Sequence, residues 1–484
     1  MNHSTRSTLV RRTLRLLALV ASAVAWSSPT QATETRAFVY TTDFSSGTIA
    51  DIQFGPPRIV SSNLATVASD AVLRYFDGYL YVVNRFGFDN IQILDPANNF
   101  ATVLQFSVGN GSNPHDMELV SPTKAYVARY DSPDLWIVNP QTGGHTGTIS
   151  LAPFADADGI PEMDRLALRN GRLFVTIQRL DRNNFFTPTD SSQIIVINPV
   201  TDTIIDADAV SPGLQGILLP FQNPLTELLA DPAGDLVVGC AGSFGVLDGG
   251  LVRIDPGTLT IAAVEISEAT LAGDINDVAP LDGGRGFVVV SDASFNTLLR
   301  SYNRANGTVT GTPFATTGFS IADIEINDRG ELWLCDRTPS DPGVRVFDGA
   351  SGSQLTVAPL NTGLPPQDLT FDPASPVGVP WADNGIAPQP LALLQVYPNP
   401  SVDLSRIRFR ISATFEGGVQ PLDLAIYDLA GRSVFGTTLS GMVDGEHTVE
   451  WDGRNNHGSR VPRGVYLLEL RFGTYRSSAR VIRF

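Results

Sequence analysis

The feature that most constrains the fold of this chain is an internal repeat of about 46 residues. Each copy holds a short apolar strand with one acidic residue, a turn, a second apolar strand, a strand that ends in Asp-Pro or Asn-Pro, and a last strand. Residues 69–106 and 115–151 show this pattern most clearly. The acidic residues recur at spacings of 46, 48, 63, 50, 46 and 45, and they are Asp70, Asp116, Asp164, Glu227, Asp277, Asp323 and Asp368. The repeat predicts one small sheet for each copy.

A four-stranded unit of this length is typical of a β-propeller blade, because a closed ring of blades buries the sheet faces that one blade cannot bury alone. Residues 36–54 supply outer strands with no inner strand before them, and PQDLTFDP around Asp368 supplies an inner strand with no blade after it. Joined together, these segments complete a seventh blade and remove exposed sheet edges. The sequence therefore predicts an all-β protein with a seven-bladed β-propeller, with six or eight blades as alternatives.

Several motifs of the repeat resemble the YVTN/NHL class of seven-bladed propellers. They are PHDMEL at 114–119, the hairpins NPQTG, NPVTD and DPGTL, and strands such as LFVTI. The resemblance covers about residues 36–375. In that class the inner strands line a central channel and ligands bind at one mouth. The resemblance implies the same fold and the same location for a ligand site, and the motifs themselves are structural.

The first 32 residues resemble an export signal. Four arginines and no acidic residue accompany the apolar run Leu16–Trp26, and small residues allow cleavage after Ala25 or Ala32. We expect residues 1–32 to be a secretory signal peptide, with an N-terminal membrane anchor as the alternative. No later segment is long and apolar enough to span a bilayer. A secreted or outer-surface bacterial protein is therefore expected.

The end of the chain predicts a second domain, after a propeller at 33–375. Residues 376–393 are rich in Pro, Gly and Ala and are expected to be a linker. Residues 394–484 alternate strands with turns, which predicts an Ig-like β-sandwich. VYPNPS, LAIYDLAGRSVF and WDGRNNHGSRVPRGVYLLEL resemble the FlgD Ig-like module and the type A C-terminal sorting domain of the type IX secretion system. The resemblance implies sorting or attachment, with the secretion machinery as a partner, and an adhesive or spacer domain is the alternative.

The propeller region is strongly acidic. Residues 33–390 hold 18 basic and 41 acidic residues, a net charge of −23. This charge repels phosphate backbones, so nucleic acid is not an expected partner. Cys240 and Cys335 are too few for a disulfide framework and are expected to be buried free thiols. We expect a monomer.

The seven acidic residues of the repeat are expected to form a ring near the channel mouth. They suit a cation site or acid–base chemistry. The interpretation that we prefer is structural, with each carboxylate accepting backbone N–H groups or pairing with an arginine and so locking adjacent blades. A second set follows the second strand of four copies and would hold an anionic ligand or neutralise the acids. This set is Arg85, Arg129, Arg179 and Arg337.

One loop resembles part of a calcium-binding loop. In DADGIPEMD, Asp156, Asp158 and Glu162 offer hard oxygen ligands, although an Asp-Gly turn also explains the pattern. Calcium is the one cofactor that the sequence suggests. His115 and His145 are the only histidines of the propeller region and are too few for a transition-metal centre. His115 belongs to the PHDMEL motif and is expected to be structural.

The insertion at 180–192 places Phe185 and Phe186 in a polar loop, where they would contact a protein or glycan or pack against the adjacent blade. No motif identifies catalytic residues. The function predicted is that of a non-catalytic binding protein with its ligand at the channel mouth. The alternatives are a metal-dependent, lactonase-like hydrolase or an NHL-type lyase with its active site there, or a structural adhesin.

Overall fold

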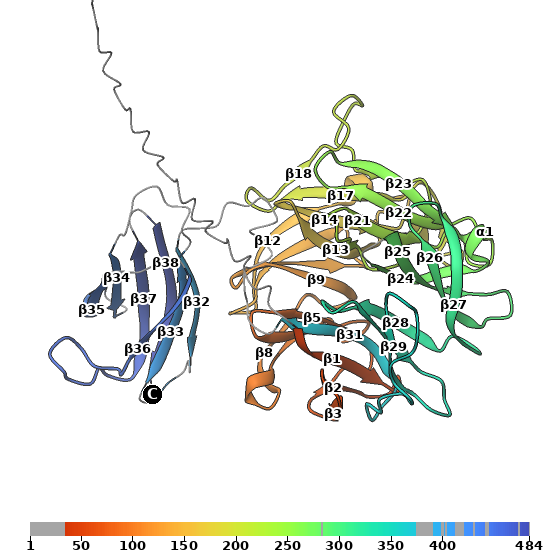
Figure 1. Ribbon diagram of the computed structural model, residues 1–484. Coiled ribbons are helices and arrows are strands. Elements are labelled where there is room, and N and C mark those ends of the chain that lie inside the picture. The colour runs from red at the N-terminus through yellow and green to blue at the C-terminus, as the bar shows by residue number, and fades with distance from the viewer. Residues whose placement is uncertain are drawn as a thin grey trace, which may run out of the picture.

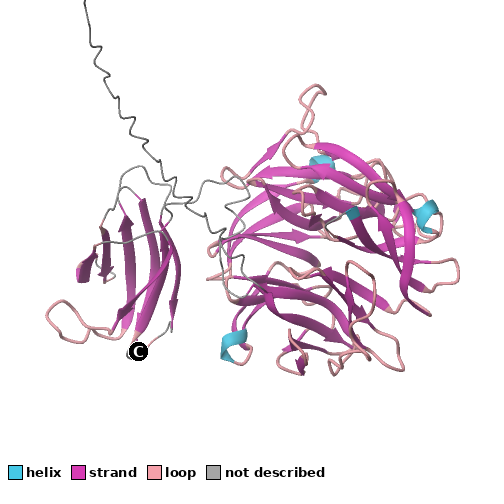
Figure 2. Ribbon diagram, viewed as in Figure 1, coloured by secondary structure: helices cyan, strands magenta, loops and turns pink. Residues whose placement is uncertain are grey.

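The computed structural model describes residues 34–281, 284–373, 391–397, 401, 404–411, 421–428, 431–440, 445–472 and 475–483. The expected signal peptide and most of the expected linker lie outside the described residues. Strands dominate the described chain (Figure 2), and the one α-helix among them, α1, is the single turn Glu268–Leu271. In this part of the chain no helix has the length and apolar character needed to cross a membrane.

Residues 34–373 fold into antiparallel sheets arranged around a common centre (Figure 1). The sheet that holds both ends of this region contains β3 (Ile59–Ser61), β2 (Gly47–Gln53), β1 (Glu34–Thr42) and β31 (Pro366–Pro373), with β4 (Thr66–Val67) beside β2. The next sheet contains β5 (Ala71–Phe76), β6 (Tyr79–Asn84), β7 (Asn90–Asp95) and β8 (Ala101–Ser107). It is followed by the sheet of β9 (Pro114–Ser121), β10 (Lys124–Arg129), β11 (Asp134–Asn139) and β12 (Gly144–Ser150).

The longest repeat forms the sheet of β13 (Met163–Arg169), β14 (Arg172–Ile177), β17 (Gln193–Asn198), β18 (Thr203–Ile205) and β19 (Ile217–Leu218), with a separate hairpin of β15 (Leu180–Asp181) and β16 (Thr187–Pro188). The following sheet contains β20 (Leu229–Ala230), β21 (Leu236–Cys240), β22 (Gly250–Asp255) and β23 (Thr260–Ser267). The next contains β24 (Asp274–Pro280), β25 (Arg285–Ser291), β26 (Thr297–Asn303) and β27 (Thr308–Thr316). The last contains β28 (Ile321–Ile326), β29 (Glu331–Asp336) and β30 (Gly343–Asp348).

The last sheet differs from the four-stranded repeat that the sequence predicts. Beside β30, isolated bridges join Val344 to Leu360 and Phe347 to Gln354 in place of a fourth strand. Pro359 interrupts this segment and has no N–H group to continue a ladder. The outer edge of this sheet is therefore irregular.

Apolar side chains between successive sheets form the core. At the closing contact, Trp333 and Val346 of the last sheet pack against Val39 and Ile52 of the first. The inner strand β31 contacts the inner strands on both of its sides, β5 and β28. The sheets therefore form a closed β-propeller, as the repeat predicts.

The first and last strands of the propeller are joined directly. Val39 of β1 pairs with Leu369 of β31, and Phe38 pairs with Thr370 (Figure 1). This pairing confirms the expectation that the inner strand around Asp368 joins the strands of residues 36–54. Both cysteines, Cys240 and Cys335, are buried and free, as expected.

The C-terminal region forms two sheets that pack as a β-sandwich. One contains β32 (Leu391–Tyr397), β33 (Ser405–Ile411) and β36 (Gly445–Trp451), and the other contains β35 (Ser433–Leu439), β34 (Leu422–Tyr427), β37 (Gly464–Phe472) and β38 (Tyr475–Arg483). Phe409 and Trp451 of the first sheet share a core with Leu424 and Leu468 of the second. Residues 391–393, which composition assigned to the linker, are part of β32 because they pair with β33.

Candidate ligand-binding mouth of the propeller

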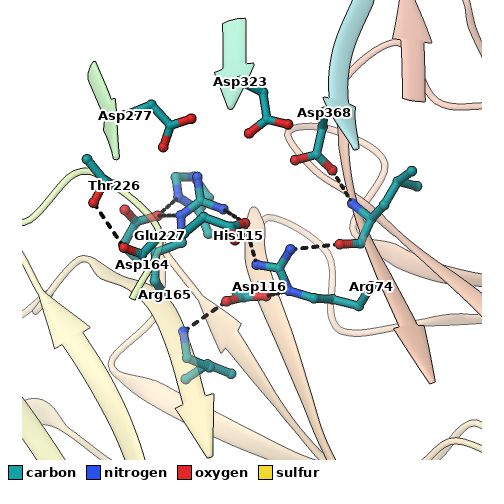
Figure 3. A network of polar contacts seen from close by, with 12 residues as sticks. Arg74, His115, Asp116, Asp164, Arg165, Thr226, Glu227, Asp277, Asp323 and Asp368 are labelled. Carbon is teal, nitrogen blue, oxygen red and sulfur yellow. Dashed lines mark hydrogen bonds and ion pairs between the residues drawn. The ribbon is translucent and has the colours of Figure 1, made fainter. Parts of the chain in front are cut away.

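A pocket of about 440 Å³ lies where the inner strands begin. Phe44 lies in its wall, and its charged lining residues are Asp70, Arg85, Arg165, Glu227, Asp277, Asp323 and Asp368. Five of the seven acidic residues singled out in the sequence therefore reach one pocket. The other two, Asp116 and Asp164, bind neighbouring side chains in the same polar network (Figure 3).

Four carboxylates make the same hydrogen bond to the next inner strand. Asp116 accepts the N–H of Leu166 at 2.8 Å, and Asp277 accepts that of Ile324 at 2.8 Å. The remaining bonds of this kind are Leu369 N–H to Asp323 at 3.0 Å and Leu73 N–H to Asp368 at 2.6 Å. These bonds tie adjacent sheets together, which is the structural role that we preferred for the repeated acid.

A recurring β-bulge aims these carboxylates. The register shifts directly before Asp116, Asp277, Asp323 and Asp368, and an equivalent shift lies between Met163 and Leu166. A bulge bends its strand and redirects the next side chain. The bulges therefore turn one position of each of these strands towards the channel.

Asp70 and Asp164 do not occupy that position. In the other strands the residue directly before the N–H donor is the acid. Before the donors Leu73 and Leu166 that position is held by Val72 and Arg165 instead. Asp164 lies in the bulge, and Asp70 precedes the first residue of β5. The sequence spacing brought the acids into approximate alignment, and a shift of one or two residues changes which side chain faces the channel.

Two arginines that the sequence reasoning missed neutralise one side of the mouth. Arg74 bridges Asp116 (Nε–Oδ1 2.8 Å) and Glu227 (Nη2–Oε1 2.9 Å). Arg165 lies 3.6 Å from Asp164 and 3.8 Å from Glu227. Burial opposes the charge of Arg74, but the carboxylates raise its pKa above the ordinary value. Both arginines lie in inner strands, β5 and β13, where the repeat otherwise places acidic residues. This position in the sequence could have identified them.

Three carboxyl groups on the other side form no close ion pair among the described residues, and the charges of Arg74 and Arg165 act on them only from further away. Asp277, Asp323 and Asp368 are each 7–8% exposed and lie across from the two arginines (Figure 3). Burial, with added repulsion from Glu227, raises the pKa of Asp277 and of Asp368 to about 7. Burial and the neighbouring acids also raise the pKa of Asp323. The mouth is therefore polarised, with counterions on one side only.

A second hollow of about 240 Å³ lies deeper in the channel, next to Glu227. Glu118 and Glu325 line it together with Arg74. Burial raises the pKa of Glu118 to about 8 and also raises that of Glu325. Each glutamate lies two residues after a ring acid, and alternation along a strand places such residues on one face. This spacing was the signal that could have identified them.

The four arginines that follow second strands have different surroundings. Arg85 lines the pocket and pairs with Asp70 at 3.3 Å. Arg129 donates to the carbonyl of Val108, and Arg179 donates to that of Phe154 and pairs with Asp190. Arg337 donates to the carbonyls of Thr42, Pro365 and Pro366. Three of the four therefore fasten loops, and only Arg85 faces the pocket.

The residues of the calcium-like loop do not fit a calcium site. Glu162 accepts from Arg182 at 2.7 Å and from Leu180 N–H, and Arg182 lies 3.9 Å from Asp158. Asp156 accepts from the Thr189 hydroxyl at 2.6 Å. Within the described ranges, no group of three or more His, Cys, Asp or Glu residues is arranged to hold a metal ion. The Arg182 guanidinium lies between Asp158 and Glu162, where a calcium ion would have to bind.

His115 is part of the structural network. Its Nδ1 lies 2.7 Å from Asp164 Oδ1, and its ring stacks on Tyr130 with centroids 4.0 Å apart. Burial lowers the pKa of His115. His145 stacks on Trp136 in an outer hairpin. Neither histidine reaches the pocket.

Comparison with solved structures supports the fold. The structure of the Pseudomonas aeruginosa periplasmic gluconolactonase PpgL is 14% identical over 70% of this chain and 98% of that chain, with a TM-score of 0.50. PorZ, an essential surface component of the type-IX secretion system of Porphyromonas gingivalis, is 15% identical over 91% of this chain, with a TM-score of 0.42. A streptogramin B lyase is 11% identical over 64% of this chain and 93% of that chain, with a TM-score of 0.41.

This chain spans 64% of the length of PorZ. At these identities the similarity concerns the fold alone. No curated protein matches the chain in sequence. Residues 403–472 match the model of the FlgD Ig-like domain, so the C-terminal β-sandwich is similar to that domain.

Proposed function

We propose that this chain is a secreted or cell-surface binding protein that holds its ligand at the mouth of a seven-bladed propeller. The N-terminal basic and apolar run supports export, and the sheets of residues 34–373 support the blade number. The FlgD-like domain at 403–472 supports a role in sorting or attachment. The propeller recognises a ligand, and the C-terminal domain directs or anchors it.

The observation that carries this proposal is the polarised mouth. Asp277, Asp323 and Asp368 line a pocket of about 440 Å³ and form no close ion pair within the described chain. Each of these carboxylates accepts a backbone N–H group, but a buried carboxylate remains costly until an opposite charge lies close to it as well. A ligand with an ammonium or guanidinium group would supply the missing counterion. The mouth therefore favours cationic ligands.

The test is calorimetric titration of the full-length protein with spermidine, a flexible organic polycation. We expect binding that releases protons near pH 7, because a bound cation lowers the raised pKa values of the carboxyl groups. The proton release appears as a dependence of the measured heat on the buffer. The combined variant Asp277→Asn/Asp368→Asn should lose both binding and proton release, and Asp190→Asn, in an exposed loop, should lose neither. Equal spermidine binding by wild type and the combined variant would contradict the proposal.

An enzymatic role is the second candidate, and one observation favours it. A carboxyl group with a pKa near the working pH suits general acid–base catalysis, and Asp277 and Asp368 both have this property. PpgL, which shares the fold, is a gluconolactonase. Hydrolysis of glucono-δ-lactone above the buffer rate, lost in Asp277→Asn and Asp368→Asn, would support this candidate.

The role of the C-terminal domain has its own test. We expect full-length protein to reach the outer surface or the medium of a host with type IX secretion, and protein that lacks residues 391–484 to remain in the periplasm. Mass spectrometry of the exported protein distinguishes a cleaved tail from a retained one. Export that is equal with and without residues 391–484 would leave the domain as a spacer.

A further inference from the structure

The connections between second and third strands gather at the pocket end of the propeller. In an antiparallel sheet this connection returns to the end at which the inner strand begins. The pocket is lined by the first residues of β5, β24, β28 and β31, so these connections surround it. Phe44 lies in one of them, between β1 and β2, and is itself part of the pocket wall.

Phenylalanines project from five of these connections. They form a set that we call the phenylalanine rim, and each is 49–95% exposed: Phe44, Phe86, Phe185, Phe186, Phe244 and Phe295. Phe88, in the β6–β7 connection, and Phe319, between β27 and β28, lie at the same end. Among the residues that the structure describes, these eight are the exposed phenylalanines. Exposed apolar groups gathered at one end of a molecule mark an interaction surface.

Four phenylalanines of the rim have a left-handed backbone at the turn of their connection. Phe44, Phe185, Phe186 and Phe295 have φ values of 65°, 55°, 56° and 60°. This left-handed region favours glycine and asparagine and is costly for a bulky side chain. These rings stay largely exposed, although the Phe44 ring contacts Arg337 and the Phe295 ring lies 5.8 Å from that of Phe319. Asparagine would suit these turn positions better than phenylalanine, so the rings are kept there at a cost to the backbone.

The chemistry of the rim and the pocket together favours a cationic partner with apolar side chains. Phenylalanine offers an apolar face and a π-system but no hydrogen-bonding group, so it suits aliphatic side chains and cations better than sugar hydroxyls. Arg337 already places its guanidinium 4.4 Å from the ring centroid of Phe44. The pocket inside the rim holds the carboxyl groups of Asp277, Asp323 and Asp368, which form no close ion pair within the described residues. The net charge of −23 for residues 33–390 opposes an anionic membrane surface.

We infer that the rim docks an extended basic segment of a partner protein, with one lysine or arginine side chain inserted into the pocket and the flanking apolar side chains on the rings. The inference rests on the proposed function and adds the class of partner. A small cation would occupy the pocket and leave the rings in water, whereas a peptide crosses several connections. Aromatic anchors around a desolvated charge are the usual centre of a tight interface.

The test uses fluorescence polarisation of the full-length protein with a labelled lysine–leucine peptide of about twelve residues, an extended segment of the kind that surface grooves recognise. The rim variant is Phe185→Asn/Phe186→Asn/Phe295→Asn, which leaves Phe44 of the pocket wall in place. Asparagine tolerates left-handed φ values, so this variant should keep or raise the melting temperature. We expect its affinity for the peptide to fall by about tenfold or more. Val200→Asn is the matched control, since Val200 is 71% exposed in the β17–β18 connection at the opposite end.

The outcomes separate the inference from the proposed function. Spermidine should bind the rim variant as it binds wild type, whereas Asp323→Asn should weaken both spermidine and the peptide. If the rim variant binds the peptide as tightly as wild type, or if a peptide with glutamate in place of lysine binds equally well, the inference is wrong. If the aspartate-to-asparagine variants bind both spermidine and the peptide as tightly as wild type, the proposed function is wrong. Loss of peptide binding in the rim variant alone, with spermidine unaffected, supports the peptide interface.

Discussion

At the scale of single residues, the unpaired carboxyl groups of the mouth make the protein sensitive to pH. The folded-state pKa of Asp277 is raised to about 7, so the folded protein binds this proton more tightly than the unfolded chain. The resulting stability is fully present below the unfolded-state pKa and is lost as the pH rises through about 7. Asp368 behaves in the same way.

We therefore expect Asp277→Asn to stabilise the protein above neutral pH and to have little effect near pH 4. Each unit of pKa shift corresponds to about 1.4 kcal/mol, so the gain should reach a few kcal/mol. Asparagine keeps a carbonyl oxygen for the Ile324 N–H but loses the second acceptor for the Val278 N–H, so the gain is smaller than the pKa shift alone implies. Thermal unfolding of both proteins across the pH range measures the difference, with Asp190→Asn as the control. If the difference in melting temperature between Asp277→Asn and wild type does not vary with pH, the pKa of Asp277 is not raised in the folded protein.

Arg74 is the opposite case, a buried cation held by two acids. Replacing it in Arg74→Met leaves Asp116 and Glu227 without this partner, and breaking a buried pair costs about 3–5 kcal/mol. The loss should be smaller near pH 5, because Glu227 loses the Arg74 charge that lowers its pKa and burial then favours its protonated form. Denaturant unfolding measures the effect, and Arg432→Met removes an exposed pair with Asp428 as the control. A small loss that is equal at both pH values would show that Arg74 contributes little.

The candidate site was predictable only in part. The repeat located Glu227, Asp277, Asp323 and Asp368, which line the pocket. It aligned Asp70 and Asp164 with the other acids although neither occupies the bulge position, and of these two only Asp70 lines the pocket. It also missed Arg74, whose guanidinium reaches Glu227 from a different sheet. Contacts between distant repeats cannot be read from spacing.

At the scale of elements, β1 closes the propeller between β2 and β31. Val39 pairs on both sides, with Ala50 and with Leu369, and is fully buried. The variant Val39→Pro would remove an N–H group from a central strand, where proline is not tolerated. We expect it to destabilise the whole propeller by about 3 kcal/mol or more and to promote aggregation through the freed edges.

Ile59→Pro is the matched control for this change, because Ile59 begins the outermost strand β3 and is 53% exposed. Proline at the first residue of an edge strand is tolerated. Far-ultraviolet circular dichroism and light scattering during heating measure both variants. Equal melting temperatures for the two variants would mean that closure by β1 is not required for stability.

The strands themselves were largely predictable, because apolar alternation and turn residues are local signals. The insertion at 180–192 was visible as the longest spacing, and it forms the small hairpin of β15 and β16. The irregular edge beside β30 was not predicted. Whether residues 353–365 form a fourth strand beside β30 depends on the residues that they contact in the folded protein. The repeat pattern alone does not reveal those contacts.

At the scale of the whole molecule, the propeller and the C-terminal sandwich have separate apolar cores. The sandwich core is built from residues between Val396 and Val481, with Trp451 at 1% exposure. Trp451→Ala should therefore destabilise the sandwich by about 3–5 kcal/mol, the usual cost of truncating a buried aromatic residue. Peptide binding at the propeller should not change.

Limited proteolysis measures this effect, since an unfolded sandwich is cut while the propeller remains protected. Leu467→Ala is the control, because Leu467 lies next to Tyr466 in β37 but points to solvent, with 42% exposure. Loss of propeller protection in Trp451→Ala would mean that the two parts fold as one unit.

The sequence by itself determined the period of the repeat, the closure of the propeller through its two ends and the Ig-like nature of the tail. These properties follow from local alternation and from the need to bury sheet faces and edges, which every copy of the repeat shares. Only the tertiary structure decided which carboxyl groups lack a counterion and that the exposed phenylalanines surround them. Charge pairing depends on distance through space, and the ring brings residues from separate repeats together at the channel mouth.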